Sequence, residues 1–389
     1  MTTFSARIIG WQRLHGRHGL PWQGADAYRV WLSEIMLQQT QVVTVIPYYQ
    51  RFVARFPDVA ALAAASEDEV LAHWSGLGYY SRGRNLFRAA QLVMRQHDGK
   101  FPQSFDDICA LPGIGRSTAA AIGALAFHQR RAILDGNVKR VLARYCAIEG
   151  YTGEKKTEMR LWQQAEALLP QREVAVYTQG LMDLGAQLCT RSKPRCEACP
   201  LRADCAARAR GLVAHLPTPR PRKALPEKRS TFLLLLDGSD ILLEKRPGSG
   251  VWGGLWCPPQ LEEEQDAAAH CAQRFGVDVA QAVVLPVFSH TFTHFKLHIA
   301  PLLLRVAQKP NGHGKYVAPD DTSHARFPLP SPLPQACEGG KDSLRAFHIN
   351  QVQEPGRVWL DMEDALRAAI PAPVRKLLQD LLELREGCA

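Results

Sequence analysis

Four cysteines lie within one 17-residue stretch of this 389-residue chain, at a spacing that suits metal ligation. Gaps of six, two and five residues separate Cys189, Cys196, Cys199 and Cys205. Four thiolates on a short loop suit either a tetrahedral metal ion or an iron–sulfur cluster. The spacing differs from the paired C-x2-C motifs of common zinc sites, but by itself it leaves structural zinc open.

Two acidic residues stand where a carboxyl group could take part in acid–base chemistry. Glu34 lies in the apolar stretch Trp31–Leu37, and burial there would raise its pKa. Asp135 begins a helical pattern, where its side chain can cap the helix and stay ionised. One protonated and one ionised carboxyl group form the pair that cleaves glycosidic bonds. Each residue alone has a simpler interpretation, a solvated surface glutamate and a helix cap.

A short turn with two glycines, Leu111–Gly115 (LPGIG), precedes a predicted helix at Arg116–Ala126. Glycines allow the backbone to turn tightly and to present N–H groups, and a helix N-terminus favours negative charge. A phosphate group is the expected ligand, although a helix–turn–helix corner without a ligand has the same pattern.

The composition is that of a globular chain of two or three domains whose first half carries the net charge. Hydrophobic residues make up 46%, no apolar run approaches a membrane span, and the N-terminus lacks the pattern of a signal peptide. The ten cysteines are therefore expected to be mostly reduced. Residues 1–210 hold 27 basic and 18 acidic residues, whereas residues 211–389 hold 20 of each. This excess of positive charge predicts a polyanion partner for the first half, with a merely solvated basic surface as the alternative.

Periodicity divides the chain at a basic, proline-rich segment. Apolar residues recur every three or four positions in residues 1–210, which predicts an all-α domain of about ten helices. Residues 211–230 are interpreted as an interdomain linker, and residues 231–389 as a mixed α/β domain with a loop or insertion at 308–350. The elements predicted in the second domain are strands at Thr231–Leu236, Ile241–Glu244, Val283–Phe288 and Leu297–Val306, and helices at Ala267–Phe275 and Val374–Leu384.

The order of these motifs resembles one protein family. The stretches Trp31–Thr40, Gly76–Tyr80, Leu111–Gly115 and Ile133–Arg140, followed by the cysteine loop at 189–205, are similar to those of the helix–hairpin–helix DNA glycosylases of the endonuclease III superfamily. Within it they resemble the adenine-specific MutY family. The resemblance implies a multidomain protein, in which an all-α helix–hairpin–helix glycosylase domain holds one 4Fe–4S cluster on its four cysteines and an α/β Nudix-like domain follows.

For the two carboxyl groups, the resemblance implies distinct roles in releasing adenine. Adenine leaves poorly as an anion, so Glu34 matches the general acid that protonates the base. Asp135 matches the carboxylate that stabilises or traps the oxocarbenium ion. Strand-cleaving relatives carry a lysine where this chain has Ser117, and a serine cannot form a Schiff base, so a monofunctional enzyme is expected. Lys139 could trap the abasic product, but a phosphate contact is its simpler role.

The same resemblance implies contacts with duplex DNA around the target base. An enzyme that acts on a paired base must extrude it and fill the gap, and Tyr79 fits a wedge. Arg82 and Arg84 follow it and are interpreted as phosphate ligands. The residues expected to contact DNA are Gln38, Gln39, Tyr79, Gly113, Gly115, Arg116, Ser117 and Lys139, with Arg191, Lys193, Arg195 and Arg202 facing phosphates from the cysteine loop.

The second domain resembles the Nudix-like domain that recognises 8-oxoguanine in this family. Its supporting residues are Trp252–Trp256 and the triplet Phe292-Thr293-His294, where the family usually has serine in the middle. Threonine keeps the hydroxyl group and adds a methyl group. A Nudix hydrolase needs a cluster of glutamates on one helix to bind magnesium, and Ala267–Phe275 contains none, so no diphosphate hydrolysis is expected.

The expected protein is a monofunctional DNA glycosylase of base excision repair. It would remove adenine opposite 8-oxoguanine or guanine in double-stranded DNA, as a monomer associated with a bacterial nucleoid in the cytoplasm and not with a membrane. Three alternatives remain: a glycosylase of the same fold acting on an oxidised pyrimidine, a non-catalytic DNA-binding or redox-sensing iron–sulfur protein, and a Nudix-type nucleotide hydrolase fused to a DNA-binding module. Ser117 argues against the first and the missing glutamates against the third.

Overall fold

The computed structural model describes residues 3–221, 224–261, 265–308 and 356–386, which form two compact units. The helical unit comprises Met1–Leu225, Gly248–Leu255 and Ala368–Ala372. The sheet unit comprises Pro226–Pro247, Trp256–Arg367 and Pro373–Ala389. Among the described helices, none is long and apolar enough to cross a membrane. The insertion expected at 308–350 lies outside the described residues except for Gln308.

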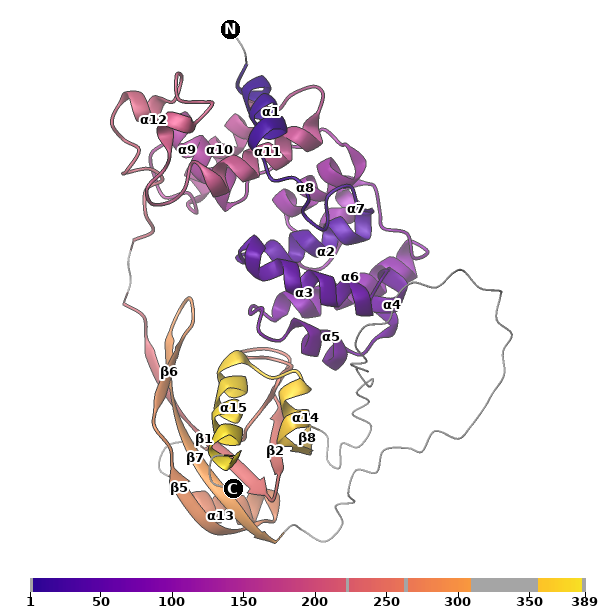
Figure 1. The fold of residues 1–389 in the computed structure, drawn as a ribbon, viewed down its shortest axis with the longest axis vertical. Helices are drawn as coiled ribbons and strands as arrows, with labels where there is room; N and C mark the ends of the chain where they lie inside the picture. The colour runs from indigo at the N-terminus through magenta and orange to yellow at the C-terminus, as the bar shows by residue number, and fades with distance from the viewer. Residues whose placement is uncertain (1–2, 222–223, 262–264, 309–355, 387–389) are drawn as a thin grey trace, which may run out of the picture. The chain divides into compact units, whose positions relative to one another are not determined.

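The helical unit confirms the expected all-α domain (Figure 1). Its α7 and α8 are the two helices on either side of the Leu111–Gly115 turn, and α8 begins at the predicted residue. The helices are α1 Phe4–His15, α2 Ala27–Leu37, α3 Val42–Arg55, α4 Val59–Ala64, α5 Glu67–Trp74, α6 Ser81–Gln96, α7 Phe105–Ala110, α8 Arg116–Phe127, α9 Gly136–Tyr145, α10 Lys155–Ala167, α11 Val174–Gln187, the 3-10 turn η1 Cys196–Ala198 and α12 Ala206–Ala209.

Short polar side chains define where many of these helices begin. Each accepts a hydrogen bond from a backbone N–H of the first turn, which has no partner inside the helix. The capping residues are Thr3, Asp26, Asp58, Ser66, Ser104 and Asp135. The start of α9 is therefore fixed by the same side chain that the sequence marks as a catalytic candidate.

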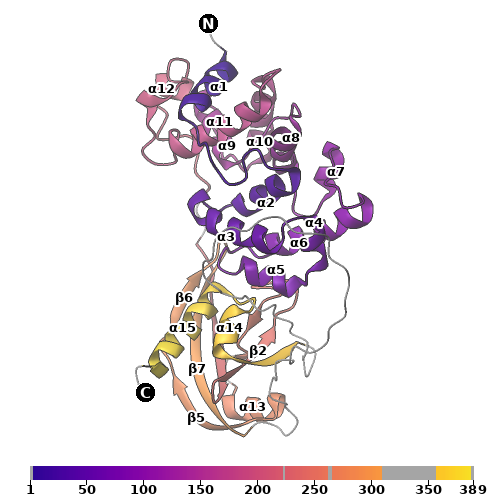
Figure 2. The ribbon, with the colours of Figure 1, turned by 45° about the vertical axis from the view of Figure 1, so that its right-hand side comes forward.

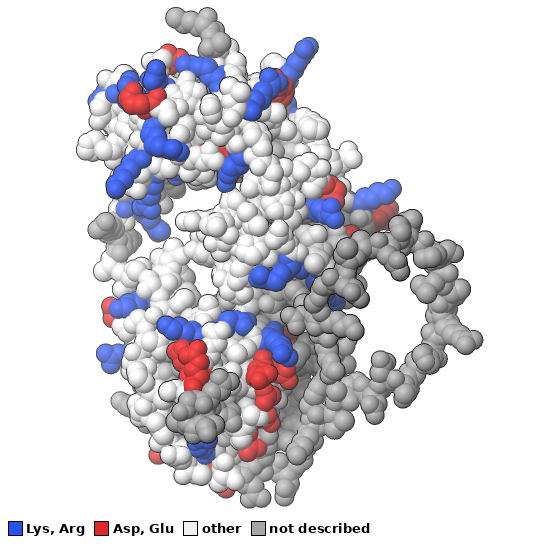
Figure 3. All heavy atoms as spheres, in the orientation of Figure 1, with Lys and Arg blue, Asp and Glu red and all other residues white. Residues whose placement is uncertain are grey.

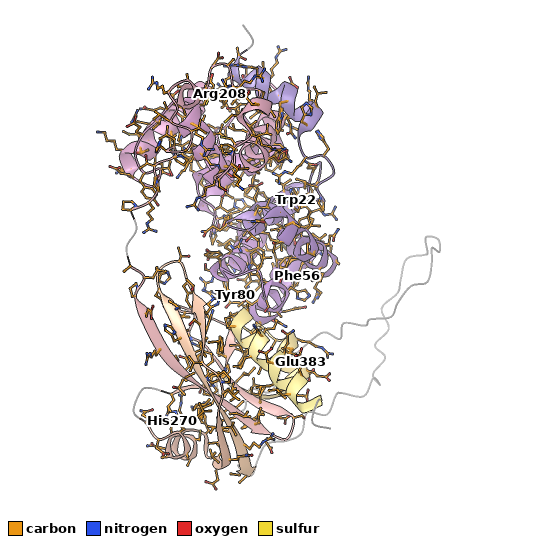
Figure 4. All side chains as sticks on the ribbon, turned by 60° about the vertical axis from the view of Figure 1, so that its left-hand side comes forward. Trp22, Phe56, Tyr80, Arg208, His270 and Glu383 are labelled. Carbon is orange, nitrogen blue, oxygen red and sulfur yellow. The ribbon has the colours of Figure 1, made fainter. Side chains whose placement is uncertain are left out.

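Large apolar side chains fill the helical unit. One core cluster joins α1, α8, α9, α10 and α11 and includes Ile8, Leu142 and Tyr177. Elsewhere Phe52 packs against Phe56 and Trp74, with ring centroids 4.7 and 6.1 Å apart. Burying each such side chain contributes roughly 1.5–3 kcal/mol. Figure 4 labels Trp22 and Phe56 among these closely packed side chains.

The segment interpreted as a linker differs from that expectation at both ends. Leu216 is 3% exposed, and its carbonyl accepts a hydrogen bond from Nε of Arg144 at 2.7 Å. Thr218 accepts a hydrogen bond from the backbone N–H of Gly150 at 3.1 Å. At the other end, strand β1 already begins at Glu227. The proline-rich composition hid these long-range contacts, which secure the first part of the segment to the helical unit.

The sheet unit is a mixed sheet in the order β3-β2-β1-β7-β5, with β4 paired to β1, β6 to β7 and β8 to β2 (Figure 2). Strands β1 and β7 pair in parallel, and the other pairs are antiparallel. The strands are β1 Glu227–Asp237, β2 Asp240–Lys245, β3 Trp256–Cys257, β4 Gln260–Leu261, β5 Asp278–Val284, β6 Phe288–Thr291, β7 Lys296–Gln308 and β8 Arg357–Asp361.

The single strand expected at Val283–Phe288 is wrong. Strand β5 ends at Val284 and β6 begins at Phe288, with Pro286 between them. Proline has no N–H to donate to a neighbouring strand, so continuous pairing is interrupted there. The strands predicted at Thr231–Leu236, Ile241–Glu244 and Leu297–Val306 all lie within observed strands.

Helices cover both faces of the sheet, which explains the continuous apolar run in β1. Phe232–Leu236 are all buried, as expected when both faces of a strand are covered. In Figure 4, His270 on α13 and Glu383 on α15 lie on opposite sides of the strands. The helices are α13 Ala267–Phe275, α14 Met362–Arg367 and α15 Ala372–Glu386.

Candidate functional site

Glu34 sits one turn before the end of α2, between buried residues of the helix. Its neighbours Ser33 and Ile35 are buried, whereas Glu34 keeps partial access to solvent. Among the residues that the structure describes, none donates a hydrogen bond to its carboxyl group or forms an ion pair with it. The protein atoms around the carboxyl group desolvate it, which, with the charge of Asp135, raises its pKa to about 8. At neutral pH Glu34 is therefore mainly protonated.

Asp135 caps α9 and is held by directed donors. Its Oδ1 accepts from the backbone N–H of Val138 at 2.7 Å, and its Oδ2 accepts from the side-chain amide of Asn137 at 3.2 Å. Burial raises the pKa of Asp135, while these two hydrogen bonds and the charge of Arg140 oppose the shift. The structure thus gives Asp135 the partners that a carboxylate needs, and gives Glu34 none.

The two carboxyl groups lie within electrostatic range of each other, although 100 residues separate them in the chain. Like charges that close together disfavour double ionisation. Donors and a nearby cation favour the charged form of Asp135, whereas burial and the charge of Asp135 favour the protonated form of Glu34. One acid and one base in the same site at neutral pH is the arrangement that can protonate a leaving group and stabilise a developing cation.

The Leu111–Gly115 turn has a backbone conformation that requires glycine. Gly113 has φ +81°, and a Cβ there would lie 2.9 Å from Cβ of Asn85, so conformation and space both demand glycine. Gly115 is the N-terminal cap of α8 and is exposed. The side-chain amide of Gln38 donates to the carbonyl of Gly113 at 3.3 Å and to the hydroxyl of Thr118 at 3.4 Å. Gln38 therefore joins the end of α2 to this turn.

Three further DNA-contact candidates already have protein partners. The Ser117 hydroxyl accepts from the backbone N–H of Leu134 at 2.9 Å, which fixes the chain one residue before Asp135. Arg116 forms an ion pair with Glu166 and lies 3.9 Å above the Trp162 ring. Lys139 donates to Glu158 at 2.6 Å. A phosphate would have to compete with these contacts for Arg116 and Lys139.

The candidate wedge lies on a turn with left-handed backbone. Gly78 has φ +72° and Tyr79 has φ +47°, and the Tyr79 side chain is 48% exposed. Gln39, at the end of α2, also has a positive φ of +57° and is exposed. An exposed aromatic ring on a constrained turn is suited to stacking between bases.

The interpretation of Arg82 as a phosphate ligand is wrong, and a phosphate would have to compete with a protein contact for Arg84. Arg82 is buried and donates its hydrogen bonds to protein acceptors. Arg84 donates to the carbonyl of Gly253, in the Trp252–Gly254 loop of the helical unit. The sequence held one signal for Arg82, since it lies four residues before Leu86 on the buried stripe of α6.

The four cysteines face one another next to two arginines. The charges of Cys189, Cys196 and Cys205 all act on Cys199. Nη1 of Arg144 donates to Sγ of Cys189 at 3.4 Å. Within the described part of the chain, no three His, Cys, Asp or Glu side chains are grouped as they would be around a single ion. A 4Fe–4S cluster is held by four cysteine thiolates, so these four thiols, one of which accepts a hydrogen bond from Arg144, have the ligand chemistry that such a cluster needs.

Arg140 connects the Asp135 turn to the cysteine loop, a contact that sequence reasoning missed. Its Nη2 donates to Oδ1 of Asn137 at 2.8 Å, and its Nε donates to the carbonyl of Cys189 at 2.7 Å. Gly185 leaves room for this arrangement, because a Cβ there would lie 2.6 Å from Cβ of Asn137. The only sequence signal was the position of Arg140 at the end of the Ile133–Arg140 motif.

Basic side chains gather on the face of the helical unit that carries α12 (Figure 3). In the cysteine loop Arg191 and Lys193 are exposed. Arg195 donates to the carbonyl of Gln187, and Arg202 to that of Glu197, both at 2.8 Å. The loop therefore offers a positive surface at which part of the charge is held in place by backbone acceptors.

In the sheet unit, the triplet Phe292-Thr293-His294 forms the tip of the β6–β7 hairpin. The backbone N–H of Phe292 donates to the carbonyl of Phe295 at 2.8 Å, and their rings stack with centroids 4.5 Å apart. Thr293 and His294 are exposed. The stacked rings support a turn that presents a hydroxyl group and an imidazole to solvent.

Comparison with known proteins agrees with both units. A model described as "HhH-GPD superfamily base excision DNA repair protein" matches residues 32–167, and one described as "NUDIX domain" matches residues 231–336. The adenine DNA glycosylase of Buchnera aphidicola subsp. Acyrthosiphon pisum (strain APS) is 34% identical over 378 residues, which cover 97% of each chain. That of Buchnera aphidicola subsp. Schizaphis graminum (strain Sg) is 38% identical over 97% of this chain and 98% of its own. The human adenine DNA glycosylase is 34% identical over 76% of this chain and 66% of its own.

Proposed function

The chain belongs to the adenine DNA glycosylases, and we propose that it removes adenine opposite 8-oxoguanine or guanine in double-stranded DNA. The product is an abasic site. The observation that carries the proposal is the coupled pair of carboxyl groups: among the described residues Glu34 has no polar partner, whereas Val138, Asn137 and Arg140 all favour the charged form of Asp135. The alternatives of a non-catalytic iron–sulfur protein and of a nucleotide hydrolase give no reason for this pair.

Glu34 and Asp135 divide the reaction between them. Protonated Glu34 gives its proton to the extruded adenine, so that the base leaves as a neutral molecule. As the N-glycosidic bond lengthens, the sugar gains positive charge, and the Asp135 carboxylate stabilises or traps it. Val138 and Asn137 keep the carboxylate ionised and directed. Water then completes the hydrolysis.

Ser117 limits the reaction to base removal. Its hydroxyl group is engaged with the backbone of Leu134, and it has no amine that could attack the sugar. Strand cleavage through a Schiff base therefore has no nucleophile at this position. Lys139, which could supply one, is paired with Glu158.

Cys189, Cys196, Cys199 and Cys205 would hold one 4Fe–4S cluster. When bound, the cluster would supply a rigid anchor for the basic loop. Hydrogen bonds from Arg144 to sulfur, and from Arg140 to the Cys189 carbonyl, tie that anchor to the helix that Asp135 caps. Iron and sulfide analysis tests this assignment, and stoichiometric zinc would contradict it.

The remaining DNA contacts are assigned to side chains at the protein surface. Tyr79 enters the stack beside the extruded base, with Gln38 and Gln39 next to it. Phe292, Thr293 and His294 recognise the base opposite the adenine. Helix α13 carries no acidic side chain to bind magnesium, so the sheet unit does not hydrolyse diphosphates. The net charge of +9 favours binding to DNA. The protein would act as a monomer on a bacterial nucleoid in the cytoplasm.

The decisive assay uses three duplexes, with adenine opposite 8-oxoguanine, adenine opposite guanine, or thymine glycol. We expect adenine release from the first two and none from the third. The strand should remain intact until alkali cleaves the abasic site. Release of thymine glycol would favour a pyrimidine glycosylase, and efficient cleavage without alkali or heat would contradict a monofunctional enzyme. Binding without any base release would favour a non-catalytic protein.

A further inference from the structure

Arg82 is a buried cation in the first turn of α6 that is held by neutral acceptors. It is 7% exposed, and within the described residues no ion pair neutralises it. Burial lowers its pKa to about 10, which leaves it charged at neutral pH. A buried charge needs hydrogen-bond partners. Within the described residues Nε of Arg82 has no acceptor, whereas both Nη groups do, so the acceptors of the Nη groups show what Arg82 holds in place.

One set of acceptors is the end of the helix that carries Glu34. Nη1 of Arg82 donates to the carbonyls of Ile35, Met36 and Gln38 at 3.0, 2.8 and 2.6 Å. Carbonyls in the last turn of a helix lack partners inside the helix and carry its negative dipole end. Arg82 therefore caps α2 directly after Glu34.

The other set of acceptors is the turn that carries Tyr79. Nη2 of Arg82 donates to the carbonyls of Leu77 and Gly78, both at 3.1 Å, and its backbone N–H donates to the carbonyl of Tyr79 at 2.9 Å. The guanidinium also lies 5.6 Å from the centre of the Tyr79 ring. Left-handed backbone at a tyrosine is unfavourable and persists only where surrounding contacts hold it.

We propose that Arg82 is a positioning residue that sets the Tyr79 turn against the end of the helix carrying Glu34. Through Arg82, the insertion of Tyr79 into the duplex is coupled to the placement of the Glu34 carboxyl group at the extruded base. This inference rests on the proposed adenine glycosylase function and adds a residue that acts through Tyr79 without touching DNA. Arginine is needed because the two Nη groups of its planar guanidinium donate to both sets of carbonyls. The ammonium group of lysine is a single point with three donors and cannot span both sets.

The test is a double-mutant cycle on single-turnover adenine release at saturating enzyme. The variants are Arg82→Lys, Tyr79→Ala and the double variant, with Arg88→Lys, an exposed arginine on the same helix, as the matched control. We expect each single variant to release adenine about 10-fold or more slowly, and Arg88→Lys to match the wild type. Because Arg82 acts through Tyr79, the double variant should be no more than about threefold slower than Tyr79→Ala alone.

Two results would overturn the inference. One is an Arg82→Lys variant that releases adenine as fast as the wild type. The other is a double variant whose fold-reduction in rate equals the product of the two single reductions, as expected for independent structural defects. If Arg82→Lys fails to fold, Thr40→Val takes its place in the cycle, because Thr40 accepts one Nη2 hydrogen bond at 3.1 Å. A wild-type protein that releases no adenine from any duplex would instead contradict the proposed function on which the inference rests.

Discussion

The helical unit and the sheet unit present their candidate residues in opposite ways. In the helical unit, Glu34 and Asp135 are desolvated, and Asp135 is surrounded by directed donors. In the sheet unit, Thr293 and His294 are exposed at a hairpin tip. The first arrangement shifts the pKa values of the two carboxyl groups, and the second places a hydroxyl group and an imidazole where solvent or a ligand can reach them. Desolvation suits a group that must move a proton, and exposure suits a group that must recognise a surface.

The largest expected effect tests the desolvated site. Glu34→Gln keeps the size of the side chain and removes its transferable proton, so adenine release should fall by about 10³-fold or more. Duplex binding, measured by fluorescence anisotropy, should stay within about threefold. Glu383→Gln in α15 is the matched control, because it makes the same chemical change at an exposed position of the sheet unit and should have no effect on release.

Asp135→Asn is expected to have the next largest effect. Asparagine can still cap α9, so the fold should persist, while loss of the negative charge should slow release by about 10²-fold. Asp58→Asn, at the cap of α4, makes the same change away from the site and should leave release unchanged. Equal losses in the two variants, measured by single-turnover release, would mean that capping alone explains Asp135.

A smaller effect is expected at the exposed hairpin. Thr293→Ala removes one hydroxyl group, whose hydrogen bond contributes about 1 kcal/mol. The preference for adenine opposite 8-oxoguanine over adenine opposite guanine should fall about fivefold, while the rate on adenine opposite guanine is retained. A variant that loses both rates equally would show that Thr293 supports the fold of the hairpin and not recognition.

Glu34→Gln should also change stability, with the opposite sign to its effect on activity. The folded pKa of Glu34 lies above its unfolded value of 4.5, so the unfolded chain releases this proton first and folding loses stability as pH rises from about 4.5 to about 8. Glu34→Gln should therefore stabilise the protein at pH 8 by up to about 4 kcal/mol, since each pH unit between the two pKa values costs about 1.4 kcal/mol. Thermal unfolding should show that gain at pH 8 and little of it near pH 4.5. A destabilised variant at pH 8 would contradict the raised pKa.

Local patterns predicted the elements well, because their signals lie within a few residues. Helix α13 has the predicted bounds, and α8 starts at the predicted Arg116. The sequence indicates Asp135 both as a helix cap and as a catalytic candidate. Only the family resemblance predicts that it works together with Glu34.

Long-range contacts could not be predicted in the same way. Leu216 looked like part of a linker, and its burial depends on Arg144, 72 residues away. Arg82 and Arg84 looked like phosphate ligands because an arginine near a predicted wedge has the same sequence pattern whether it faces DNA or the core. Only the fold shows which carbonyls surround each guanidinium.

The most direct test of the account is the pH dependence of single-turnover adenine release from a duplex with adenine opposite 8-oxoguanine. If Glu34 is the proton donor and its pKa is about 8, the rate constant should be nearly constant at pH 6 to 7 and fall toward tenfold per pH unit well above pH 8. A rate constant that stays level up to pH 9.5, or rises with pH, would contradict a protonated Glu34 as the acid.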